Sequence, residues 1–129
     1  PKGWVTIEGG FKHVPMERFY KQIARHPYVL SPPGAGPDCH RHWEAILLGS
    51  IPVVLKSQAT AILSDLPCLR VNHWGEVTQE RLHAELPILQ ERFKSPAMDT
   101  TLGMCPNSRS PWVSTFKSPS MMQSSSPVV

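Results

Sequence analysis

Residues 28–55 read YVLSPPGAGPDCHRHWEAILLGSIPVVL, a pattern that predicts a strand, a loop, a helix and a second strand in that order. Residues 28–31 are a short apolar run typical of a strand, and residues 32–37 are rich in the proline and glycine of loops. Residues 51–55 are apolar on both faces, as in a strand buried within a parallel sheet. Pro52 has no backbone N–H and therefore belongs at the start of that strand, where the ladder loses no hydrogen bond.

Between these strands the sequence predicts a helix from about Cys39 to Leu48. Asp38 is well placed as its N-cap, because a short carboxylate can accept hydrogen bonds from the first turn. Gly49 is expected to end the helix at the position after the C-cap, where glycine is preferred. One face of this helix is predicted to pack in the core through Trp43, Ile46 and Leu47.

The sequence before this stretch predicts an amphipathic helix over residues 15–25, with Pro15 at its first position. The dipeptide His26-Pro27 should end the helix, because the residue before a proline is pushed out of the helical region. Its apolar face, at positions i, i+3, i+4 and i+7, is formed by Met16, Phe19, Tyr20 and Ile23.

After this stretch, residues 59–63 suggest a short helix and residues 68–71 a third strand. Thr78 is expected to cap a last helix that runs toward Phe93, and Pro87 is expected to kink that helix or split it in two. Helices that alternate with strands over short links are typical of an α/β fold with a parallel sheet.

The 129 residues are enough for one domain and a tail. We place the domain at residues 1–94 and expect residues 95–129, rich in serine and proline, to be a disordered low-complexity tail. The chain begins at Pro1 without a methionine, so we expect further sequence upstream. The net charge of +3 suits an anionic ligand but does not identify one.

The junction between the first strand and the helix has the character of a phosphate site. Free N–H groups and the positive end of the dipole meet an anion at a helix start, and Gly34 and Gly36 let the backbone approach it or take a positive φ. Arg41 can bind a diphosphate through two N–H groups, and Glu44 on the same helix face can accept hydrogen bonds from both ribose hydroxyls. The alternatives are an ordinary strand-to-helix turn and an exposed ion pair between Arg41 and Glu44.

Residues 28–55 strongly resemble the donor-site signature of exostosin-like glycosyltransferases (family 47 type). That signature has a strand ending in Ser-Pro-x-Gly, then Arg-x-x-Glu-Ala, then Leu-Gly-x-Ile-Pro-Val. The resemblance extends over residues 14 to about 90. The matching residues are Ser31, Pro32, Gly34, Arg41, Glu44, Ala45, Leu48, Gly49, Ile51, Pro52 and Val53.

The resemblance implies a GT-B architecture, in which two Rossmann-like domains face each other, with this chain as the C-terminal, donor-binding domain. It implies that Glu44 holds the ribose and Arg41 the diphosphate of a UDP- or GDP-sugar, with the backbone of Gly34, Ala35, Gly36 and Asp38 lining the phosphate site. His40 is a candidate for a further donor to the diphosphate.

No obligatory cofactor or cation is implied by the resemblance. The acceptor, a glycan or glycoprotein that receives a hexose, and the catalytic residues, which stay unknown, would belong largely to a missing N-terminal domain. A typical eukaryotic member is a Golgi enzyme with its domain in the lumen. Alternatives are a non-catalytic nucleotide-binding or scaffold module and a truncated gene product without function.

Other site types are disfavoured by the sequence. His40 and His42 point to different faces of a helix, which argues against a metal clamp. The cysteines Cys39, Cys68 and Cys105 have no metal-finger spacing, and we expect Cys39 and Cys68 to be small buried residues. Basic residues are scattered without interleaved aromatics, so nucleic acid is a poor candidate for a partner.

Overall fold

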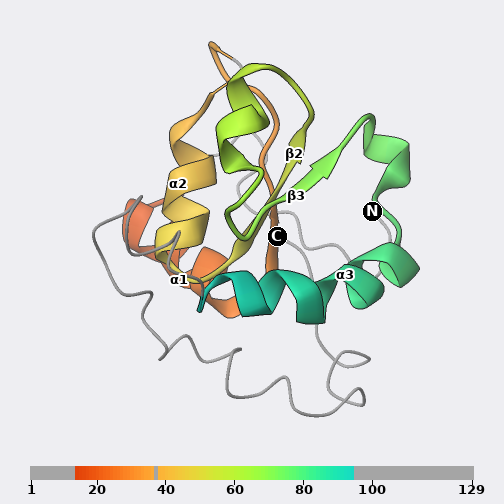
Figure 1. Cartoon of the computed structure of the whole chain (residues 1–129). Helices are drawn as coiled ribbons and strands as arrows, with labels where there is room; N and C mark the ends of the chain where they lie inside the picture. Colours follow the sequence, from red (N-terminus) through yellow and green to blue (C-terminus); the bar gives the residue numbers. More distant parts are fainter. Residues whose placement is uncertain (1–13, 37, 95–129) are drawn as a thin grey trace.

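The structure is a computed structural model that describes residues 14–36 and 38–94 (Figure 1). The tail predicted at residues 95–129, with Cys105, lies outside the described residues. None of the helices in the described ranges is both long and apolar enough to cross a membrane. In chain order the elements are α1 (Met16–Arg25), β1 (Tyr28–Leu30), α2 (His40–Leu47), β2 (Ile51–Leu55), the 3-10 helix η1 (Ala59–Leu63), β3 (Leu69–Val71), the 3-10 helix η2 (Trp74–Glu76) and α3 (Gln79–Arg92).

The three strands form one parallel sheet in the order β1-β2-β3, which confirms the predicted α/β fold with a parallel sheet. Tyr28 pairs with Ile51 on one side of β2, and Val53 pairs with Leu69 on the other. The N–H of Ile51 donates to Pro27 O at 2.8 Å on the β1 side, so the nitrogen of Pro52 faces the β3 side. Because Pro52 precedes the first residue of β2 that pairs with β3, the missing N–H costs no ladder bond, as predicted.

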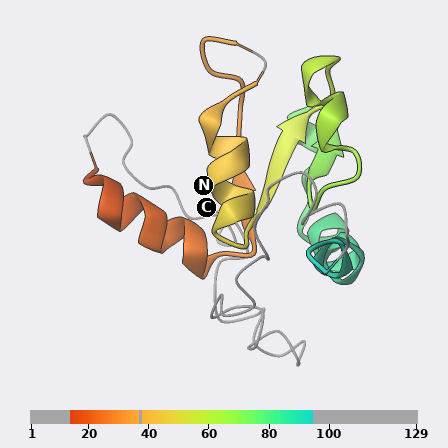
Figure 2. The same ribbon diagram turned by 60° about the vertical axis from the view of Figure 1, so that its left-hand side comes forward.

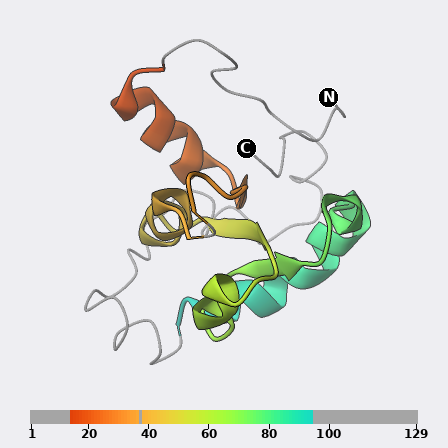
Figure 3. The ribbon, with the colours of Figure 1, turned by 90° about the horizontal axis from the view of Figure 1, so that it is seen from above.

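Helices cover both faces of the sheet, which explains why β2 is apolar on both sides. Val29 packs with Ile23 of α1 and Ala45 of α2. Its neighbour Tyr28 points to the opposite face, and its hydroxyl donates to Leu82 O of α3 at 2.8 Å. Figures 2 and 3 show α1 and α2 on one side of the strands and α3 on the other. Two buried clusters result, a small one around α1 and a large one that includes the inner face of α3.

Helix α1 ends where the sequence predicts. Arg25 is its last residue, and His26 before Pro27 is extended (φ −113°, ψ 137°). Pro15 was expected at the first helical position but occupies the N-cap, so the helix begins one residue later, at Met16. Of the predicted apolar face, Ile23 is fully buried and Phe19 and Tyr20 pack beside it, but Met16 is 66% exposed. Met16 lies in the first turn, before the part of α1 that packs against α2 and β1.

The end of α2 has the hydrogen bonds of a Schellman motif, which confirms the predicted role of Gly49. Gly49 has a φ of 82°, the one positive φ among the described residues. Its N–H donates to Ile46 O at 3.0 Å, and the N–H of Ser50 donates to Ala45 O at 2.8 Å. This turn connects the end of α2 directly to β2.

Helix α3 is capped as predicted but is not divided. The side chain of Thr78 accepts a hydrogen bond from the N–H of Arg81 at 3.2 Å. Pro87 was expected to kink or split the helix; the split is wrong, because one helix runs from Gln79 to Arg92, and the kink stays a prediction. Pro87 faces solvent, where water can bind the carbonyl that its missing N–H leaves open. The helix is held to the sheet on both sides of Pro87 by buried Leu82, Leu86 and Leu89.

The predicted buried residues of α2 and the cysteines are only partly confirmed. Ile46 is fully buried and Trp43 packs at the edge of the large cluster, but Leu47 is 45% exposed. Cys68 is buried, and burial raises the pKa of its thiol to about 12, so it stays protonated at neutral pH. Cys39 is half-buried rather than buried, because it lies where the exposed loop enters α2.

Candidate functional site

The loop of residues 31–39 leaves β1 and enters α2 at the carboxyl edge of the sheet, at the top of Figure 1. All strands are parallel, so the ends of β2 and β3 meet the same edge. Ligands of open α/β sheets bind at this edge, because loops there present side chains and helix N-termini to a common space. The predicted site therefore lies at the edge of the sheet that suits a ligand.

Helix α2 begins without a side-chain cap. Its N-cap residue is Cys39 (φ −141°, ψ 146°), no side chain accepts a hydrogen bond at the cap, and the first turn contains no acidic residue. The prediction that Asp38 caps the helix is wrong, because its Oδ1 instead accepts a hydrogen bond from Nε1 of Trp43 at 3.2 Å. The N–H of His42 donates to Cys39 O at 3.0 Å, and no side chain caps the positive end of the helix dipole.

The glycines of the loop are not required by the fold. Neither Gly34 nor Gly36 has a positive φ, so their conformational freedom is not used. A Cβ atom at Gly34 would lie 3.9 Å from Cβ of Cys39, and one at Gly36 would lie 3.8 Å from Asp38 O, both ordinary contacts. Gly34 and Ala35 are exposed, and the loop offers its backbone to solvent.

A buried polar pair, which the sequence analysis missed, joins the loop to α2. Oγ of Ser31 lies 2.6 Å from Nδ1 of His42, and both residues are almost fully buried. The backbone N–H of Ser31 donates to Val53 O at 2.9 Å, which holds the end of β1 against β2. His40 is exposed, which confirms that the two histidines point to different faces of α2. In the sequence, the spacing of Ser31 and His42 does not distinguish a buried polar pair from two exposed polar residues.

The side chains of Arg41 and Glu44 both face α1. The hydroxyl of Tyr20 donates to Oε1 of Glu44 at 3.0 Å. Cζ of Arg41 lies 6.0 Å from the centre of the Phe19 ring, at the limit of a cation–π contact. The hydrogen bond to Glu44 also raises the pKa of Tyr20 above its ordinary value. Two adjacent aromatic residues of α1 thus contact the two residues of α2 that the sequence singles out.

Two further groupings are absent from the described part of the chain. No ion pair there joins Arg41 to Glu44, so the simple ion-pair alternative is not formed. Within residues 14–36 and 38–94, no three histidine, cysteine or acidic residues gather as a metal site would require.

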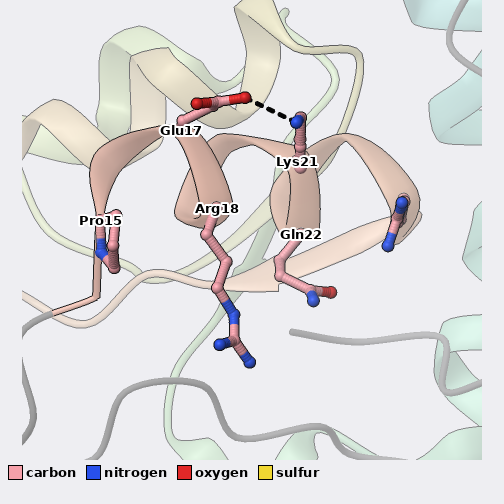
Figure 4. A pocket seen from close by; sticks show the side chains of 6 residues that line it. Pro15, Glu17, Arg18, Lys21 and Gln22 are labelled. Carbon is pink, nitrogen blue, oxygen red and sulfur yellow. Dashed lines mark hydrogen bonds and ion pairs between the residues drawn. The ribbon is translucent and has the colours of Figure 1, made fainter.

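A hollow of about 380 Å³ lies elsewhere, along the outer side of α1 (Figure 4). Its described lining includes Arg18, Lys21 and Arg25, and Lys21 donates to Glu17 at 2.6 Å. None of the predicted site residues lines this hollow, so it is separate from the junction of β1 and α2.

Glu76 organises the loop that follows β3 at the same edge of the sheet. Its Oε1 accepts hydrogen bonds from the N–H and Nδ2 of Asn72 at 3.2 and 2.8 Å, and its Oε2 accepts from Arg81 at 2.5 Å. These donors, led by Arg81, lower the pKa of Glu76 to about 2. The carboxylate therefore ties β3 to the start of α3.

We expect Glu76→Gln to remove a pH-dependent part of the stability. Because the folded state lowers this pKa, the carboxylate stabilises the fold above its ordinary pKa of 4.5 and loses that effect as pH falls toward 2. Urea titrations at several pH values should show a difference between wild type and variant that is largest near neutral pH and shrinks below about pH 4. The exposed Glu80→Gln is the control; an equally large difference at low pH would contradict the expectation.

No family model matches this chain, and the comparison with curated proteins finds no match either. The geometry of the junction and the resemblance of residues 28–55 are therefore the basis for a functional proposal.

Proposed function

We propose that this domain binds the nucleotide part of a UDP- or GDP-sugar at the junction of β1 and α2. In this proposal it is the Rossmann-like donor half of a GT-B glycosyltransferase of the exostosin type. The single observation that supports it best is the uncapped start of α2, which opens at the carboxyl edge of a parallel sheet beside Arg41 and Glu44. A diphosphate requires hydrogen-bond donors and a cation, and the hydroxyls of a ribose require an acceptor such as a carboxylate.

The diphosphate is assigned to the first turn of α2 and to Arg41. The positive end of a helix dipole favours an anion, and neither a side-chain cap nor an acidic residue occupies the first turn of α2. Cζ of Arg41 lies 6.0 Å from the centre of the Phe19 ring, and a guanidinium beside an aromatic ring can still donate its N–H groups to phosphate oxygens. His40, exposed in the same turn, adds a possible donor. These groups would stabilise the negative charge that develops on the diphosphate as it leaves the sugar.

The ribose is assigned to Glu44. An ionised carboxylate has about four lone pairs on two oxygens, and Tyr20 engages only Oε1. Oε2 can then accept hydrogen bonds from the sugar hydroxyls. The acceptor glycan or glycoprotein, the catalytic residues and a Golgi location are assigned to the complete enzyme, with the acceptor bound mostly by its N-terminal domain. The transfer itself, on this proposal, does not depend on a cofactor.

The test is a calorimetric titration of the full chain with UDP and with GDP. We expect one nucleotide to bind, and we expect Arg41→Ala and Glu44→Ala each to weaken binding about 10- to 100-fold, because each removes hydrogen bonds to a charged group. The matched controls are Arg25→Ala and Glu91→Ala, which remove an exposed arginine at the end of α1 and an exposed glutamate in α3. Circular dichroism should show that all four variants fold.

Gly34→Ala separates ligand approach from folding in the same experiment. Its Cβ would make only an ordinary contact with Cys39, so the free energy of unfolding should change little, while nucleotide binding should weaken. Failure of the wild-type chain to bind either nucleotide at millimolar concentration would overturn the proposal. Binding without sugar transfer by the complete protein would instead favour the non-catalytic module.

A further inference from the structure

The contact between α1 and α2 includes a hydrogen bond from Tyr20 to Glu44 as well as apolar packing. Tyr20 is half-buried, so water could satisfy its hydroxyl, yet the hydroxyl donates to a glutamate carboxylate 3.0 Å away on another helix. Its ring packs beside that of Phe19, with centroids 5.9 Å apart and planes tilted by 45°. The rings place α1 against α2, and the hydroxyl adds a directed bond to Oε1 of Glu44.

We infer that Tyr20 is a positioning residue, whose hydroxyl holds Oε1 of Glu44 so that Oε2 is presented to the ribose of the bound nucleotide. The inference rests on the proposed function, because it needs Glu44 to contact the ribose. A glutamate has three rotatable side-chain bonds, and a carboxylate that is free to rotate must lose that freedom when a ligand binds. A bond from a second, rigid helix restricts the rotation before binding and so lowers the cost of recognition.

The neighbouring aromatic residue supports the other half of the nucleotide. Phe19 contacts the guanidinium of Arg41, which is assigned to the diphosphate. Adjacent residues of α1 therefore support different parts of one ligand: Tyr20 supports the ribose contact and Phe19 the diphosphate contact. This division predicts that the two residues can be separated by the choice of ligand.

Tyr20→Phe removes only the hydroxyl and keeps the ring, so the fold should be retained. We expect the Kd of the full chain for UDP or GDP, whichever the wild type binds, to rise about 3- to 10-fold. The Kd for inorganic pyrophosphate, which has no ribose, should not change. The same holds for the 2′,3′-dideoxy form of the nucleotide, which lacks both hydroxyls that Glu44 would contact. Phe19→Leu is the matched comparison and should weaken pyrophosphate and nucleotide alike.

The possible results distinguish failure of the role of Tyr20 from failure of the proposed nucleotide binding. If the wild-type chain binds neither UDP nor GDP, the proposed function fails first. If it binds one and Tyr20→Phe binds that nucleotide equally well, only the positioning role fails. If Tyr20→Phe weakens the nucleotide, its dideoxy form and pyrophosphate to the same extent, the hydroxyl acts through the packing of α1, and the inference is also overturned. A ribose-dependent loss at an unchanged melting temperature supports it.

Discussion

Replacing Ile46 by alanine is expected to lower the free energy of unfolding by about 2–5 kcal/mol. Ile46 is fully buried on the inner face of α2 and belongs to the large core cluster, so truncation leaves a cavity between the helix and the sheet. A domain of this size is stable by only about 5–10 kcal/mol, so the change would remove a large part of its stability. Denaturant titration should detect it as a lower midpoint with an unchanged slope.

Leu47→Ala is the matched control for this prediction, because it removes a similar side chain from the next position of the same helix. Leu47 is 45% exposed, and its loss should change the free energy of unfolding by only about 0.5 kcal/mol. Equal losses for the two variants would contradict the observed orientation of α2. The comparison also bears on the site, since the same orientation turns Arg41 and Glu44 toward α1.

Replacing Pro87 by alanine is expected to stabilise the domain by about 2–2.6 kcal/mol. Proline inside a helix costs about 3 kcal/mol relative to alanine, because it lacks an N–H and its ring collides with the carbonyl four residues earlier. Alanine restores that hydrogen bond, while the greater freedom of the unfolded chain offsets about 0.4–1 kcal/mol of the gain. Pro87 is exposed, so no core contact is lost. The melting temperature should rise by about 8 °C or more.

Ile88→Ala controls for the loss of apolar surface at the neighbouring position, which is 59% exposed, and should be close to neutral. A destabilising Pro87→Ala would mean that the proline imposes a bend on α3 that the packing of Leu86 and Leu89 requires. That result would contradict the prediction and would explain why a proline is tolerated there.

Most of the fold could be predicted because its signals are local. Gly49 ends α2 and Thr78 begins α3 through hydrogen bonds within a few residues of each, so the residue types alone identify these positions. The apolar run of β2 predicts coverage on both faces, and the structure places α1 and α2 on one side and α3 on the other. The predicted split at Pro87 is wrong because local propensity counts one lost hydrogen bond, whereas the buried leucines on both sides of it hold the helix together.

The candidate site was less predictable. Its position at the end of β1 follows from the order of strand, loop and helix, and Arg41 and Glu44 follow from their spacing. The hydrogen-bond partner of Asp38 could not be predicted from the sequence. Its side chain lies near both the start of α2 and Trp43, and it accepts a hydrogen bond from the indole N–H of Trp43. Tyr20 and Phe19 were assigned to the core from their helical spacing, which carries no information about the polar groups they meet on α2.

By itself the sequence determined the order of the elements, most of their ends and the parallel arrangement of the strands, since these depend on bonds and sterics between near neighbours. Only the tertiary structure decided that Leu47 faces solvent while Ile46 is buried, that His42 pairs with Ser31, and that Tyr20 meets Glu44. Contacts of this kind depend on how far each helix is rotated about its axis when it packs on the sheet. That rotation is set by the packing of all the side chains together, and a small change in it exchanges which residues are covered and which polar groups meet.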